Sequence, residues 1–168
     1  MPFQCGCRSL SFAFVFGFLL IFGPALCSGQ FSGSAVSASS ALSIPQAQII
    51  QPGDLSRILH SRGSAKPLVL QVGSRVMFEQ AHIPGAQYAG PGSQPAGLES
   101  LAAKVVSLPK DAFVVLYCGC CPWNRCPNLG PAFNQLRQSG FVNVKVLYIA
   151  SNFGDDWVNK GYSVEKGN

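Results

Sequence analysis

The sequence has few charged residues, and those present form no run of one sign. Only 11% of the 168 residues are Asp, Glu, Lys or Arg, and the formal net charge of +5 comes from scattered lysines and arginines. A nucleic-acid-binding surface or a polybasic membrane patch needs a basic cluster. The sequence therefore predicts no nucleic-acid partner, and a solvated surface explains most of the mild basicity.

Cysteine is absent between Cys27 and Cys118, and again after Cys126. A disulfide scaffold would spread its cysteines around the fold, so this distribution argues against one. Histidine is also scarce: only His60 and His82 occur, and neither lies near a cysteine in the sequence. What remains is a local group of four thiols at positions 118, 120, 121 and 126. This clustering points to a local site.

The longest apolar run is too short for a comfortable membrane span. Leu10–Phe22 has 13 residues, whereas a spanning helix needs about 20. The run follows Arg8 and precedes small residues, so we predict a signal peptide over residues 1–27, with cleavage near Cys27–Gln30. Export to the periplasm or the exterior, an oxidising compartment, follows from this. The alternative is an uncleaved N-terminal anchor, which would be the protein's one attachment to a membrane.

Residues 28–43 are rich in Ser, Ala and Gly and have no periodicity, so we predict a linker there and one domain over 44–168. Within the domain, apolar runs typical of strands alternate with helical periodicity. Strands are expected at 49–50, 68–72, 87–89, 114–117 and 144–149. Helices are expected to about residue 61 behind an Asp54 N-cap, then at 75–81, 98–108, 131–139 and 153–160, with an irregular loop over 90–97. This alternation predicts an α/β fold, an open parallel sheet of about five strands with helices on both faces.

The apolar run that ends at Tyr117 is followed at once by the sequence CGCCPWNRCPN, residues 118–128. We expect a strand, a loop and then a helix. Such a loop lies at the carboxyl end of a strand, where open α/β sheets bind ligands. Its backbone N–H groups and the N-terminus of the next helix favour negative charge. A cysteine there is expected to have a lowered pKa and to react as a thiolate.

Three segments, taken in order, resemble the rhodanese-like family. His82–Ala86 reads HIPGA, where the family has G-H-I-P-G-A. The strand ending at Cys118 stands where the family places its catalytic cysteine. Gly140–Val144, followed by Asp156–Val164 with its W-x-x-x-G-Y pattern, matches the end of the family's domain. The resemblance covers about residues 45–166 and implies a single rhodanese-like domain.

The chain departs from the family pattern where activity is concerned. The family's first long strand usually ends in D-x-R, and this chain has Gln71–Gly73 instead. The family's active loop runs C-x-x-x-x-R, but six residues separate Cys118 from Arg125, and only the count from Cys120 fits. The fold therefore carries over better than the activity.

For activity, the resemblance implies sulfur transfer. Cys118 is the expected nucleophile, taking sulfane sulfur from a small anion such as thiosulfate and holding it as a persulfide. Arg125 could pair with the donor's oxyanion. A thiol acceptor or a reductant would complete the cycle, and no cofactor is expected. The alternative nucleophiles or resolving thiols are Cys120, Cys121 and Cys126, and the expected pocket residues are Gly119, Trp123 and Asn124.

Three other functions stay open. Neighbouring thiols in an oxidising compartment tend to form a disulfide, which favours a thiol–disulfide redox role. Four thiolates can also gather around one soft metal ion, and the ligands would then be Cys118, Cys120, Cys121 and Cys126. The missing D-x-R and the longer loop suit a non-catalytic rhodanese-fold binding domain.

We expect the exported protein to begin near Cys27–Gln30, because a signal peptidase cleaves after small residues behind an apolar run. Intact-mass spectrometry of the protein recovered from outside the cytoplasm measures this. A full-length mass confined to the membrane fraction would support the anchor instead.

Overall fold

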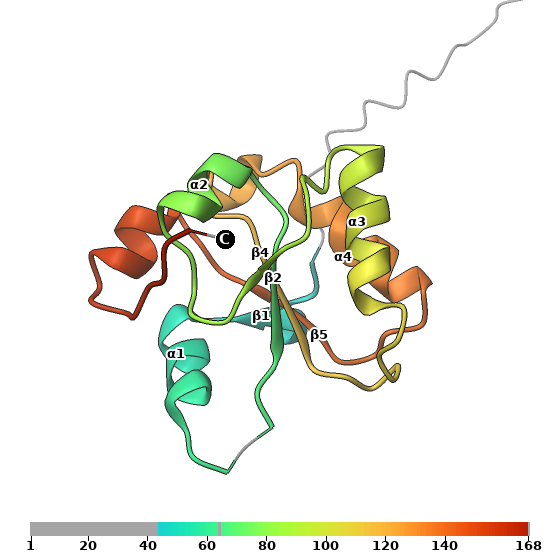
Figure 1. The fold of residues 1–168 in the computed structure, drawn as a ribbon, viewed down its shortest axis with the longest axis horizontal. Helices are drawn as coiled ribbons and strands as arrows, with labels where there is room; N and C mark the ends of the chain where they lie inside the picture. Colours follow the sequence, from blue (N-terminus) through green and yellow to red (C-terminus); the bar gives the residue numbers. More distant parts are fainter. Residues whose placement is uncertain (1–43, 64, 168) are drawn as a thin grey trace, which may run out of the picture. The chain divides into compact units, whose positions relative to one another are not determined.

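A computed structural model describes residues 44–63 and 65–167, so the predicted signal peptide and linker lie outside the described residues. The centre is a five-stranded sheet in the order β1-β5-β4-β2-β3 (Figure 1). All four strand pairings are parallel, which confirms the predicted sheet. The strands are β1 (Ile49–Ile50), β2 (Leu68–Gln71), β3 (Gln87–Tyr88), β4 (Val114–Tyr117) and β5 (Val144–Leu147).

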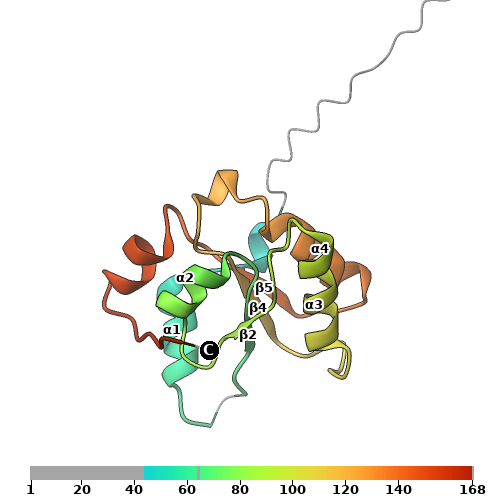
Figure 2. The same ribbon diagram turned by 45° about the horizontal axis from the view of Figure 1, so that its top comes forward.

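Helices cover both faces of this sheet, as predicted. Figures 1 and 2 show α1, α2 and the last helical turn on one side of the strands, and α3 and α4 on the other. None of the helices in the described part of the chain is long and apolar enough to cross a membrane. The helical elements are α1 (Pro52–His60), α2 (Arg75–Gln80), α3 (Pro95–Val105), α4 (Leu129–Gln138), the 3-10 turns η1 (Gln46–Gln48) and η2 (Trp123–Arg125), and the π-helical turn η3 (Gly154–Val158).

The predicted N-cap of the first helix is wrong. Helix α1 begins at Pro52 and its N-cap residue is Gln51, so Asp54 lies inside the first turn. Proline suits the first helical position because its missing N–H would have no partner there. Asp54 instead accepts a hydrogen bond from Arg57 at 2.9 Å and places its negative charge near the positive end of the helix dipole.

Two other helices begin earlier than predicted. Helix α3 begins at Pro95, inside the segment that the sequence predicts as an irregular loop, and α4 begins at Leu129. Pro131 consequently lies in the first turn of α4, where the backbone N–H that proline lacks would be unpaired anyway.

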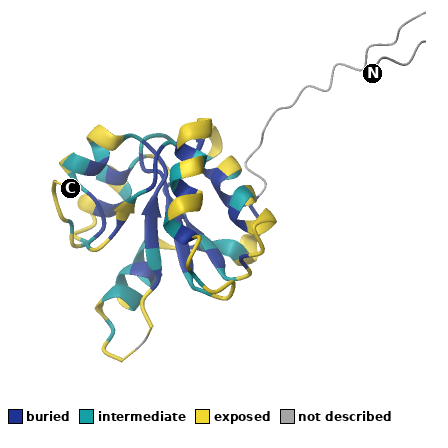
Figure 3. Cartoon of the chain, turned by 45° about the vertical axis from the view of Figure 1, so that its right-hand side comes forward, coloured by how far each residue is buried: buried dark blue, intermediate teal, exposed yellow. Residues whose placement is uncertain are grey.

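Strand β4 is the central and most completely buried strand, because it pairs with β2 on one side and β5 on the other. Successive side chains along a strand point to opposite faces. Leu116 and Cys118 accordingly pack with α3 and α4, whereas Tyr117 packs with Phe153 and Trp157 on the opposite face. Figure 3 shows the strands buried and the exposed residues on the outer sides of the helices.

His82 has a structural role in its turn. Its side chain is 4% exposed and stacks on Phe78 with the ring centroids 4.0 Å apart. Its Nδ1 lies 2.9 Å from the Phe78 carbonyl oxygen, within hydrogen-bond distance. The backbone of His82 pairs with Glu165, so this turn also fastens the C-terminal segment to the domain.

We expect Trp157→Ala to lower the free energy of unfolding by about 3–5 kcal/mol, because it empties a large buried site. Trp157 is 1% exposed, and its Nε1–H donates to the Ser163 carbonyl at 2.9 Å. Urea unfolding followed by circular dichroism measures the change. The control is Val106→Ala at a 77% exposed side chain, for which we expect a change within about 0.5 kcal/mol. Equal stabilities of the two variants would contradict the assigned core.

Candidate functional site

The cysteine loop runs from the end of β4 to the start of α4. The register of β2 and β4, from Leu68 opposite Val114 to Gln71 opposite Tyr117, fixes where β4 ends. In Figure 2 the part of the loop that contains η2 rises beyond the ends of the central strands. The thiols therefore lie at the carboxyl edge of the sheet, where parallel sheets place their ligand sites.

Two contacts hold the loop against the segment that follows β5. The Trp123 N–H donates to the Ala150 carbonyl at 3.2 Å, and the Trp123 ring packs on Tyr148 with the centroids 5.1 Å apart. Near the start of the loop, the Phe153 N–H donates to the Gly119 carbonyl at 3.0 Å. Gly119 has a φ of +76°, and a Cβ there would lie 2.9 Å from the Phe153 Cβ, so this turn requires glycine.

Three of the four sulfur atoms form a chain of close contacts. The Sγ atoms of Cys118 and Cys120 are 3.0 Å apart, and those of Cys120 and Cys121 are 3.4 Å apart. Cys126 is buried in the same core cluster as Cys118 and is close enough to influence the pKa values of Cys118 and Cys121. All four thiols are free. The loop therefore brings together the four cysteines that the sequence singles out.

The contact between Cys118 and Cys120 shifts the pKa values of the two thiols in opposite directions. Hydrogen bonds with Cys120 and Cys126, followed by burial, raise the pKa of Cys118 far above its ordinary value. The hydrogen bond from Cys118 lowers the pKa of Cys120 to about 6, which outweighs the opposing effect of burial. At neutral pH, Cys118 is therefore the protonated donor and Cys120 the thiolate acceptor.

Cys121 is less acidic than Cys120, and Cys126 is less exposed to solvent. Burial, then the hydrogen bond with Cys120, raises the pKa of Cys121 to about 12. Proximity to the Cys118 thiol lowers the pKa of Cys126 against burial, and the N–H groups of Asn128 and Leu129 help, but the single Cys118 proton can be donated to only one of the two sulfurs at a time. Cys126 is only 5% exposed, however. Cys120 thus combines an acidic thiol with access to solvent.

Asn128 is a site residue that the sequence analysis missed. Its side chain is buried, and its Nδ2 donates to Cys118 Sγ at 3.3 Å and reaches to 3.9 Å from Cys120 Sγ. Its Oδ1 accepts from the Ser93 N–H at 3.1 Å. Asn128 occupies the N-cap position of α4 without a capping side-chain bond. In the sequence, Asn128 is visible only as an asparagine shortly before a predicted helix. That position indicates a helix cap and not a hydrogen bond to a cysteine sulfur.

Gln71 and Gly73 are also site residues, although the sequence marks them only as departures from a pattern. The Gln71 Nε2 donates to the Cys118 carbonyl at 3.2 Å, and its Oε1 accepts from the Gly73 N–H at 3.1 Å. A Cβ on Gly73 would lie 2.9 Å from Cys118 Sγ. The end of β2 therefore holds the end of β4 and leaves room for the sulfur.

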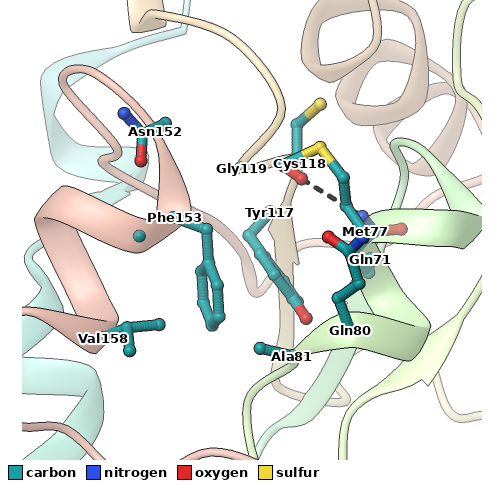
Figure 4. A pocket seen from close by; sticks show the side chains of 11 residues that line it. Gln71, Met77, Gln80, Ala81, Tyr117, Cys118, Gly119, Asn152, Phe153 and Val158 are labelled. Atoms are coloured by element: carbon teal, nitrogen blue, oxygen red, sulfur yellow. Dashed lines mark hydrogen bonds between the residues drawn. The ribbon is translucent and has the colours of Figure 1, made fainter. Parts of the chain in front are cut away.

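A pocket of about 240 Å³ lies on the other side of β4 (Figure 4). Tyr117 and Phe153 supply aromatic walls, and Gly119 also lines it. Contact of Gly119 with a substrate stays a prediction. Figure 4 shows the Cys118 side chain pointing away from Tyr117 and Phe153, as their positions on opposite faces of the strand require. Cys118 and Gly119 therefore stand between this pocket and the other thiols.

The comparison with protein families decides the classification. The model of the rhodanese-like domain matches residues 51–148. The chain belongs to the rhodanese-like domain family. No curated protein matches the sequence.

Two solved structures are similar to this rhodanese-like domain. The Alr3790 protein from Anabaena sp. is 24% identical with a TM-score of 0.54, and the match covers 70% of this chain and 92% of that one. The BH2092 protein from Bacillus halodurans is 24% identical with a TM-score of 0.53, covering 70% of this chain and 75% of that one. At these identities the similarity supports the fold alone.

The other predicted residues of the rhodanese-like loop are Trp123, Asn124 and Arg125. Asn124 and Arg125 are exposed on η2. Among the described residues, no hydrogen bond or ion pair joins Arg125 to a cysteine sulfur. Trp123 packs on Tyr148 and covers the loop. Contact of Trp123, Asn124 or Arg125 with a substrate stays a prediction.

A soft metal ion is the other group that this cluster could hold. The sulfurs of Cys118, Cys120 and Cys121 all lie within 4.8 Å of one another, and thiolates are the ligands preferred by Cu(I) and Zn. In a tetrahedral zinc site with Zn–S bonds of about 2.3 Å, neighbouring sulfurs are about 3.8 Å apart. The contacts at 3.0 and 3.4 Å would therefore have to open on metal binding.

We expect Cys120 to be the first thiol alkylated by iodoacetamide, at a rate that is constant above about pH 7. The thiolate is the reacting form, and the pKa of Cys120 is lowered to about 6. Below the pKa of Cys120, about 6, the rate falls about tenfold per pH unit, since protonation removes the thiolate. Trypsin separates residues 111–125 from Cys126, and fragmentation of that peptide assigns the label.

The matched control is the same labelling in urea, where all four thiols lose their folded surroundings and titrate at about pH 8.5. Preferential labelling of Cys121 in the folded protein, or a midpoint near 8.5 for Cys120, would contradict the acidity assigned to the loop.

Proposed function

We propose that this rhodanese-like protein moves sulfane sulfur through a cysteine persulfide, with Cys120 as the nucleophile. The observation that carries the proposal is the pairing of Cys118 and Cys120: a buried thiol 3.0 Å from Cys120 Sγ favours a partly exposed thiolate there. Membership of the rhodanese-like family supports the class of reaction. The proposed substrate is a small anion such as thiosulfate.

In the proposed reaction, the Cys120 thiolate attacks the outer sulfur of thiosulfate. A sulfur–sulfur bond forms to Cys120, the bond to the central sulfur of the donor breaks, and sulfite leaves with the electron pair. Covalent catalysis of this kind divides one difficult transfer into two steps. The Cys120 N–H and the Asn128 Nδ2 hydrogen-bond with Cys120 Sγ and favour its negative charge. Arg125 follows Cys120 at the family's C-x-x-x-x-R spacing, and we propose that it meets the incoming oxyanion.

The nucleophile differs from the Cys118 that the sequence favours. Cys118 ends its strand as the family's cysteine does, but it is 2% exposed and donates its proton to neighbouring sulfur. A protonated, buried thiol is a poor attacking group. We propose that Cys118 supports Cys120, and that the N-terminal segment exports the protein to an oxidising compartment.

The second candidate is a soft-metal-binding module, which the sulfur positions favour. Metal and sulfur transfer exclude each other at one site, because a metal-bound thiolate is no longer a free nucleophile. Metal content and free thiols, measured in protein purified without a chelator, separate the two. One metal per chain with no free thiols would contradict sulfur transfer.

We expect Cys120→Ser to abolish the release of sulfite from thiosulfate, because the attacking thiolate is gone. Reduced wild-type protein is expected to release one sulfite per chain in a single turnover, measured with a sulfite-specific dye. The matched variant is Cys121→Ser, which removes the adjacent thiol and is expected to release sulfite. Sulfite release that survives in Cys120→Ser but not in Cys121→Ser would move the nucleophile to Cys121.

A further inference from the structure

The thiol of Cys118 faces the sulfur that would carry the persulfide. Its Sγ lies 3.0 Å from Cys120 Sγ, within the separation of about 3–3.5 Å from which bound groups react. The Cys118 side chain is 2% exposed, so it is shielded from other thiols in solution. We propose that Cys118 is the resolving thiol of this site, so that the protein reduces sulfane sulfur to hydrosulfide instead of passing it to an acceptor.

This inference rests on the proposed function and adds the fate of the sulfur. The Cys118 sulfur attacks Cys120 Sγ, and a Cys118–Cys120 disulfide forms while the bond from Cys120 to the outer sulfur breaks. The outer sulfur leaves with the electron pair and gains the Cys118 proton, so it departs as hydrosulfide. Two cysteines are oxidised and one sulfane sulfur is reduced. A dithiol reductant then restores both thiols by disulfide exchange.

The geometry favours Cys118 over Cys121 for this step. Cys121 Sγ is also close to Cys120 Sγ, at 3.4 Å. Adjacent residues, however, have Cα atoms about 3.8 Å apart, whereas disulfides usually need about 4.4–6.8 Å. Cys118 and Cys120 are separated by Gly119, and the turn at its φ of +76° brings the two sulfurs together.

Burial makes Cys118 a poor nucleophile toward a donor in solution, because few molecules reach it. It does not prevent attack on Cys120 Sγ, which is already 3.0 Å away in the folded loop. The leaving outer sulfur takes the Cys118 proton, so the step needs no further base.

The test is a single turnover of the reduced full chain with thiosulfate, following sulfite, hydrosulfide and the mass of the peptide 111–125. The wild type is expected to release one sulfite and one hydrosulfide, and the peptide is expected to lose two hydrogens with Cys121 still open to alkylation. Cys118→Ser keeps a hydroxyl that can donate to Cys120 Sγ, so it is expected to release sulfite, more slowly than the wild type, but no hydrosulfide. Its peptide is expected to carry one extra sulfur. Cys121→Ser is the matched variant and is expected to end in the disulfide.

The outcomes separate the two proposals. Sulfite release with a stable persulfide in the wild type overturns the resolving role and leaves the proposed function standing. Hydrosulfide release that persists in Cys118→Ser and stops in Cys121→Ser also overturns it. Absence of sulfite from the wild type overturns both. The disulfide map of the wild type needs no variant, so a Cys118→Ser protein that fails to fold does not prevent the decision.

Discussion

The hydrogen bond between the sulfurs of Cys118 and Cys120 is the interaction on which the chemistry of this loop depends. Cys118 is buried and packed with α3 and α4, whereas Cys120 is partly exposed. The two thiols therefore hold one negative charge between them, and the burial of one fixes its place on the other. Thiols, the Asn128 amide and backbone N–H groups provide polarity around these sulfurs.

Parts of the chain that are distant in sequence hold Cys118 and Cys120 in position for that interaction. Gln71 at the end of β2 ties down the Cys118 carbonyl, and Phe153 beyond β5 holds the Gly119 carbonyl. The start of α4 supplies the amide of Asn128 and the N–H groups that face Cys126. Each of these segments follows or precedes a strand of the same parallel sheet. The order of the strands thus gathers at one edge the groups that no single segment could supply.

The sequence predicts the regular parts of this arrangement well and the loop poorly. Strands such as Val114–Tyr117 are short apolar runs bounded by turn residues, and their period and length show in the sequence itself. The acidity of Cys120 depends on the burial of Cys118 and on a turn at Gly119, neither of which has a periodic signal. Asn128 could be read only as a cap, because its partners are sulfurs brought to it by the folded loop. The early start of α3 at Pro95 was missed since the two prolines of that segment favoured an irregular loop.

The position of Gly73 links two features that look independent in the sequence. The family's strand commonly carries an arginine there, and this chain has neither that arginine nor the usual spacing of the active loop. With Cys118 Sγ at 2.9 Å from where even a Cβ would stand, no side chain fits at position 73 while the sulfur keeps its place. A larger residue at position 73 would therefore displace Cys118 Sγ. The size of this one residue thus limits where the buried sulfur, and with it the contact to Cys120, can lie.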